Sequence, residues 1–139
     1  MSTLKVIENK ISYIKKRLIS VSEYRTSSLE KLNSDKMLRS VVERELYVIA
    51  QAVIDLAEAV IAYKNLRKPT TMRESFDILG EAQILPREFL EDFSKIVGFR
   101  NALAHDYQDL KIETIYDVLK NKLNQVEEFI NYIKQDLKL

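Results

Sequence analysis

The chain has 139 residues, 46% of them hydrophobic and 31% charged, and its formal net charge is +1. This length and composition predict a single globular domain over residues 1–139. The near-neutral balance excludes a strong overall field for nucleic acid, so any RNA contact must come from a local cluster of charges. The lack of cysteine excludes disulfides, thiol catalysis and thiolate metal sites.

The sequence is poor in turn-forming residues, with two glycines and two prolines, and it therefore favours long helices over many short strands. Residues 1–10 carry charges and lack an apolar signal core, and no run approaches the roughly 18 apolar residues of a membrane span. The cysteine-free composition fits a reducing compartment. We expect a cytoplasmic, all-α protein without membrane contact.

A first helix is predicted from apolar residues that recur every three or four positions. Its stripe consists of Leu4, Ile7, Ile11, Ile14, Leu18 and Val21. The basic run of residues 15–17 beside this stripe is more typical of a solvated face than of an RNA contact. Asn33, Ser34 and Asp35 are turn and N-cap residues that are predicted to separate this helix from the next.

A second long helix is predicted over residues 42–63, either as a bundle helix or as a coiled-coil seam. Its stripe consists of Val42, Leu46, Ile49, Val53, Leu56, Val60 and Tyr63. Core packing is the expected role of all of them. Residues 64–70 then form a linker, in which Pro69 prevents the helix from continuing.

A capping box formed by Thr71 and Glu74 predicts a short helix that ends near Gly80. Its inward residues are Met72, Phe76 and Leu79. Pro86 suits the first turn of a fourth helix, which runs into residues 100–107. The buried face of that helix is Phe89 or Leu90, Phe93, Ile96 and Val97. The last long helix has the stripe Ile112, Ile115, Leu119, Leu123, Val126, Ile130, Ile133 and Leu137. The expected fold is an all-α bundle of about five helices, three long and two short.

The only histidine in the chain, His105, lies in an octet at residues 100–107 that reads RNALAHDY. In an unbroken helix, His105 would point about 140° away from Arg100. Two arrangements would bring these side chains together. Either the helix loosens near Ala104, or a second copy of the chain supplies the missing partner across a two-fold axis.

The residue types of the octet suit RNA cleavage by transesterification. Imidazole moves protons near neutral pH, so His105 is the candidate general acid or base, with one copy from each chain of a dimer covering both roles. Arg100 is the candidate for holding the phosphate and stabilising its developing charge, and Asn101 for orienting the imidazole. Tyr107 is suited to donating a hydrogen bond to phosphate or stacking on a base. We expect no metal and no cofactor.

On spacing alone, a helix cap or a solvated polar corner is the more common role of such a histidine and arginine. The octet also resembles the signature of the HEPN superfamily: an arginine, four to six residues beginning with a polar one, a histidine, any residue and a tyrosine. Arg100, Asn101, His105 and Tyr107 match it. The residues that flank the octet, 96–99 and 112–119, resemble the HepT-like branch of this superfamily. The segments at residues 43–46, 52–55 and 66–69 resemble it as well, so the resemblance covers about residues 35–135.

The resemblance implies a homodimeric HEPN bundle in which two copies of the motif line a cleft. It implies a metal-independent endoribonuclease toxin of a HEPN/MNT (type VII) toxin–antitoxin system, with Arg100 and His105 catalytic and Asn101 supporting them. The implied partner is an MNT-type nucleotidyltransferase antitoxin, which transfers AMP from ATP to Tyr107. AMP would add bulk and negative charge beside the arginine, where substrate phosphate is expected.

Two other functions remain open at this level. One is a HEPN dimer without catalysis, which binds nucleotide or RNA or serves a nucleotidyltransferase as its partner subunit. The intact motif argues against a degenerate, purely binding version. The other is a helical dimerisation subunit in which the octet has only a structural role.

Overall fold

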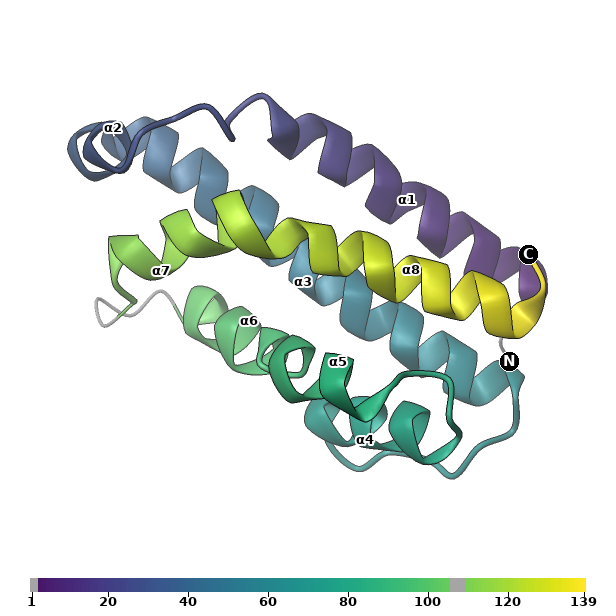
Figure 1. The fold of residues 1–139 in the computed structure, drawn as a ribbon. Coiled ribbons are helices and arrows are strands. Elements are labelled where there is room, and N and C mark those ends of the chain that lie inside the picture. The colour runs from purple at the N-terminus through teal and green to yellow at the C-terminus, as the bar shows by residue number, and fades with distance from the viewer. Residues whose placement is uncertain (1–2, 106–109) are drawn as a thin grey trace.

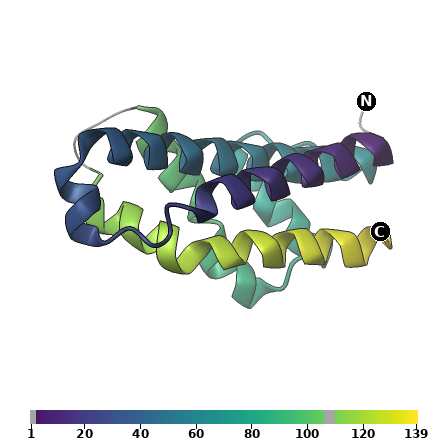
Figure 2. The same ribbon diagram turned by 90° about the horizontal axis from the view of Figure 1, so that it is seen from above.

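The computed structural model describes residues 3–105 and 110–139, and every regular element in these ranges is helical. The elements are α1 (Leu4–Ser22), α2 (Leu29–Ser34), α3 (Lys36–Tyr63), α4 (Met72–Glu81), α5 (Arg87–Phe93), α6 (Ile96–Ala104), α7 (Ile112–Asp117), the π-helical turn η1 (Val118–Lys122) and α8 (Leu123–Leu137). The start of α1 and the end of α8 lie at the same end of the bundle (Figure 1, Figure 2). The predicted all-α bundle with three long helical runs is confirmed.

The central helix is α3, which packs against α1 on one side and against α4 and α6 on the other (Figure 1). Its predicted stripe is buried from Val42 to Val60. The prediction for Tyr63 was wrong: this side chain is 40% exposed, because α3 ends there at the surface and a phenol tolerates a half-wet position. Burial of these apolar side chains supplies the main favourable free energy of the fold.

By length and composition, α3 comes nearer to a membrane span than we expected from the sequence. An 18-residue window within it is apolar enough to cross a bilayer, but half of that window is buried inside the bundle. An apolar helix that other helices cover is the usual core of a soluble bundle. We therefore interpret α3 as a core helix.

The shorter elements are divided more finely than the sequence predicts. The extra helix α2 begins after Ser28, whose side chain accepts a hydrogen bond from the amide of Lys31 at 3.0 Å. The expected fourth helix is two helices, because the amides of Lys95 and Val97 bond carbonyls three residues back and the chain turns there. This turn gives α6 its own direction, along α3, and so sets the orientation of the octet.

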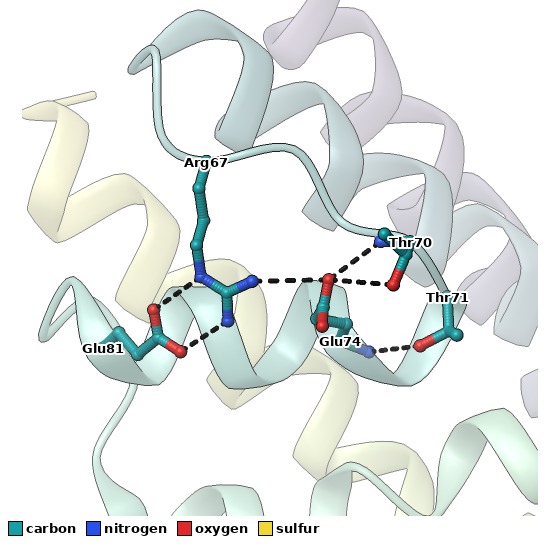
Figure 3. Close-up of polar contacts among 5 residues, drawn as sticks. All are labelled: Arg67, Thr70, Thr71, Glu74 and Glu81. Carbon is teal, nitrogen blue, oxygen red and sulfur yellow. Dashed lines mark hydrogen bonds and ion pairs between the residues drawn. The ribbon is translucent and has the colours of Figure 1, made fainter.

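The predicted caps are present where α3 and α4 begin. Asp35 accepts a hydrogen bond from the amide of Leu38 at 3.0 Å, and the hydroxyl of Thr71 accepts one from the amide of Glu74 at 3.1 Å. Glu74 reaches back to the amide of Thr70 at 2.8 Å, one residue earlier than in the usual capping box (Figure 3). Arg67 then ties the linker to α4 through Glu74 and a two-pronged contact with Glu81.

Asp92 of α5 ties the short helices to the C-terminal run. Its carboxylate accepts hydrogen bonds from Gln125 at 2.7 Å and from Lys122 at 2.8 Å, and it also pairs with Lys95 at 3.3 Å. The bonds from Gln125 and Lys122 hold the pKa of Asp92 well below its ordinary value. A depressed folded-state pKa means that Asp92 stabilises the fold above the unfolded pKa, and that this contribution is lost as the pH falls through the folded value.

Asp92→Asn should therefore lower the free energy of unfolding at pH 7 by about 1 kcal/mol, a value reduced for solvent screening because the site is partly exposed. Urea unfolding of both proteins at pH 7 and at pH 3 measures this difference. The gap should narrow at pH 3, because the carboxylate of the unfolded wild-type chain, with its ordinary pKa of about 3.9, is then largely protonated while the folded one stays ionised. An equal gap at both pH values would show that the charge of Asp92 is not what stabilises this contact.

Candidate functional site

The guanidinium of Arg100 lies at the contact between α6 and α3. Its Nε donates to Oε1 of Gln51 at 2.7 Å, its Nη1 to Oδ1 of Asn101 at 3.0 Å, and its Nη2 to the hydroxyl of Tyr47 at 3.4 Å. The guanidinium carbon also lies 5.5 Å from the centre of the Tyr47 ring, within the range of a cation–π contact. Arg100 is half-buried and held on several sides.

All three acceptors around Arg100 are uncharged. Three other arginines, Arg17, Arg39 and Arg67, pair with glutamates, whereas Arg100 forms no ion pair with any residue that the structure describes. A guanidinium that is partly removed from water without a counter-ion keeps its full charge for an anionic ligand. This is the electrostatic arrangement expected of a phosphate site.

His105 lies at the end of α6, immediately after its last helical residue. It is the C-cap, with φ −87° and ψ −4°, and its amide donates to the carbonyl of Asn101 at 3.2 Å. The helix therefore stops at Ala104, and the assembly of Arg100 with His105, within one chain or across a dimer, stays a prediction. The His105 side chain is exposed, while Arg100 turns onto α3. The described contacts bring Arg100 and Asn101 together, and they place His105 one turn after Asn101.

The roles predicted for Asn101 and Tyr107 stay predictions. The side chain of Asn101 contacts Arg100, and its expected role in orienting the imidazole stays a prediction. Tyr107 lies outside the described residues. The functional roles of Arg100 and Asn101 stay predictions, and the structure adds the contacts that hold Arg100.

Two residues of this cluster, Tyr47 and Gln51, were missed from the sequence. They are four apart on α3, on the side away from its apolar stripe, so their side chains share one face of the helix. Gln51 also donates from Nε2 to Oδ1 of Asp55, four residues further on, at 2.9 Å. The available signal was this polar spacing along a helix otherwise assigned to the core, but spacing alone does not show that Arg100 lies opposite.

A hollow of about 370 Å³ lies beside the cluster and reaches the last residues of α6. Its lining consists of Ser40, Glu43, Arg44, Tyr47, Leu103 and Ala104. A larger, mostly apolar cavity of about 530 Å³ lies between α6, α3 and the C-terminal run, but neither Arg100 nor His105 lines it. Neither residue lines the smaller hollow either, but Tyr47, which contacts Arg100, and Ala104, which precedes His105, do, and we therefore place the candidate site beside this hollow.

Known proteins are similar to this chain in sequence and in fold. Residues 7–133 match the family model described as ribonuclease HepT-like. The mRNA nuclease HepT of Shewanella oneidensis is 30% identical over 131 residues, which cover 94% of this chain and 98% of that protein. The tRNA nuclease HepT of Aphanizomenon flos-aquae is 27% identical over 132 residues, 95% of this chain and 90% of that protein.

A solved structure of the tri-AMPylated Shewanella oneidensis HEPN toxin in complex with MNT antitoxin superposes with a TM-score of 0.86. It is 28% identical, and the match covers 96% of this chain and 99% of that one. The bundle is therefore of the HEPN type, as predicted. The chain belongs to the ribonuclease HepT-like family. The prediction of a HepT-like ribonuclease is thus confirmed at the level of the family.

Proposed function

We propose that this chain is a metal-independent endoribonuclease toxin of a HEPN/MNT (type VII) toxin–antitoxin pair, with the octet as its catalytic centre. The observation that carries the proposal is the half-buried, uncharged surrounding of Arg100, which leaves a full positive charge available to RNA phosphate. The similarity to the Shewanella and Aphanizomenon nucleases supports RNA as the substrate. Its action belongs in the cytoplasm, where RNA and ATP are both present.

The residues of the site fit the steps of transesterification. The 2′-hydroxyl attacks the phosphorus and loses a proton, the bond to the 5′-oxygen breaks, and that oxygen gains a proton. His105 serves as the acid or base that moves these protons. Arg100 binds the phosphoryl oxygens, where negative charge accumulates. Asn101 supports both, through its contact with Arg100 and its position one turn before His105.

A homodimer would complete this site. In one chain, Arg100 is directed onto α3 and the exposed His105 lies at the end of α6, and one imidazole does not readily serve as both base and acid in the same step. A second copy related by a two-fold axis places two octets in one cleft. The RNA strand then meets two arginines and two histidines.

Purified protein incubated with RNA and EDTA tests the proposed function. Wild-type protein should cleave RNA in the presence of the chelator, and its expression should arrest the growth of a bacterial host. Growth arrest that persists with His105→Ala would contradict catalysis as the cause and favour the non-catalytic HEPN dimer. RNA left intact by the folded wild-type protein would contradict the proposal directly.

Control by an antitoxin is a separable part of the proposal. The solved complex contains a tri-AMPylated toxin and an MNT antitoxin, which supports a nucleotidyltransferase partner that adds AMP, and the resemblance to the family signature implies Tyr107 as the acceptor. Incubation with that partner and ATP should raise the intact mass of this chain by one or more AMP units and stop cleavage, because the added phosphate repels substrate. Tyr107→Phe should show no mass gain. A mass gain that persists in this variant would place the acceptor at another residue.

A further inference from the structure

We propose that Gln51 is a positioning residue for RNA cleavage: it holds Arg100 through an uncharged acceptor and so keeps the guanidinium charge available for phosphate, while Asp55 fixes the orientation of its amide. The inference rests on the proposed ribonuclease function. It assigns a role to two residues of α3 that lie far from the octet in the sequence. Neither belongs to the motif.

The chemistry of the three groups determines which way the Gln51 amide faces. An ionised carboxylate only accepts hydrogen bonds and a guanidinium only donates them. The amide of Gln51 therefore turns its NH₂ towards Asp55, at 2.9 Å, and its oxygen towards Nε of Arg100, at 2.7 Å. A flipped amide would oppose donor to donor and acceptor to acceptor. Asp55 thus selects the orientation that receives Arg100.

The amide also separates the negative charge from the arginine. A carboxylate in direct contact with Arg100 would hold it equally well, but it would neutralise much of its charge and compete with phosphate for the same donors. With Gln51 between them, Asp55 affects the position of Arg100 only through the Gln51 amide. Coulomb attraction falls with distance and with solvent screening, so the guanidinium stays cationic in effect.

Donors remain on Arg100 for a ligand. A guanidinium has five N–H groups, and Gln51, Asn101 and Tyr47 accept one each. Subtracting these three bonds leaves two N–H groups without an acceptor among the described residues, one on each terminal nitrogen. Two donors on one planar group suit the paired oxygens of a phosphate. The contacts thus fix the arginine and leave its ligand-binding capacity in place.

The sharpest test exchanges the amide and the carboxylate of Gln51 and Asp55, the two residues that form a hydrogen-bonded relay to Arg100. The double variant Gln51→Glu with Asp55→Asn keeps the net charge and provides for both hydrogen bonds, but it moves the carboxylate into contact with Arg100. The matched control is Asp117→Asn with Asn121→Asp, a second pair four residues apart whose side chains form a 2.8 Å hydrogen bond. Initial rates of RNA cleavage, thermal melting, and binding of an all-deoxy oligonucleotide that cannot be cleaved are measured for each protein.

The relay exchange should lower kcat/KM by about tenfold or more and weaken oligonucleotide binding, with a melting temperature equal to or above that of the wild type. The control exchange should change none of these. Wild-type cleavage and binding by a folded relay-exchange variant would overturn the inference, because a merely structural relay is preserved by the exchange. If wild-type protein bound the oligonucleotide but cleaved no RNA, only the proposed function would fail, since the binding comparison still tests Gln51.

A second variant keeps the inference testable if the double variant does not fold. Gln51→Leu removes the acceptor without adding charge, and Gln51 is only partly buried. This variant should lower kcat/KM by about tenfold, because Arg100 loses its shortest contact while the charge is kept. Wild-type kcat and KM in folded Gln51→Leu protein would contradict a positioning role.

Discussion

Replacing His105 by alanine should lower the rate of RNA cleavage by about a thousandfold while leaving the bundle folded. Proton transfer by a positioned side chain contributes roughly a hundredfold to ten-thousandfold to such reactions, and His105 is the only imidazole in the chain. His105 is exposed at the end of α6, so its loss should change the free energy of unfolding by about 1 kcal/mol or less. Single-turnover cleavage of labelled RNA and urea unfolding measure the two effects.

Lys111→Ala is the matched control for this prediction, because Lys111 is another exposed polar residue near the start of α7. It should cleave RNA at nearly the wild-type rate. If His105→Ala also retained a rate within about threefold of wild type, the octet histidine would not be the proton-transfer group. A large loss of stability without a specific loss of rate would instead favour a structural octet.

Replacing Arg100 by alanine should lower the cleavage rate by about a hundredfold, the magnitude typical of removing one group that stabilises developing charge. Arg100→Lys should recover only part of this loss. A lysine keeps the charge but cannot make the three directed contacts that hold the guanidinium to Gln51, Asn101 and Tyr47. Rates at saturating protein and affinity for RNA at two salt concentrations separate the effect on the reaction from the effect on binding.

Arg67→Ala tests whether any arginine would behave in this way. Arg67 is an exposed arginine in the linker between α3 and α4. Its charge is already paired with Glu74 and Glu81 of α4 (Figure 3). The Arg67→Ala protein should cleave RNA at the wild-type rate. An Arg100→Ala protein that cleaved as fast as Arg67→Ala would mean that the Arg100 guanidinium is not where the reacting phosphate binds.

Much of the helical framework follows from the sequence, because local physics determines it. The stripe of α3 buries one side of the helix, and Asp35 and Thr71 cap helices through hydrogen bonds to residues only three positions away. The break between α5 and α6 could not be predicted in this way. The apolar spacing continues through Ser94 and Lys95, and the turn there depends on how α6 packs against α3.

The same distinction applies to the candidate site. Arg100, Asn101 and His105 are neighbours in the chain, so their spacing exposes them as a group. Gln51 lies 49 residues before Arg100, and only the packing of α6 on α3 brings the two together. The basic run at residues 15–17 of α1, which we expected to be a solvated face, shows the same limit: Arg17 forms an ion pair with Glu45 of α3, a partner that no local pattern reveals.

The chemical ends of the RNA fragments test the central claim most directly. Wild-type protein and His105→Ala are incubated with a defined RNA in excess EDTA, and the fragments are analysed by mass spectrometry. Metal-independent transesterification predicts 2′,3′-cyclic phosphate and 5′-hydroxyl ends from the wild-type protein, and no such fragments from His105→Ala. Cleavage that stops with the chelator, or fragments that carry 5′-phosphate ends, would contradict the proposed mechanism at the octet.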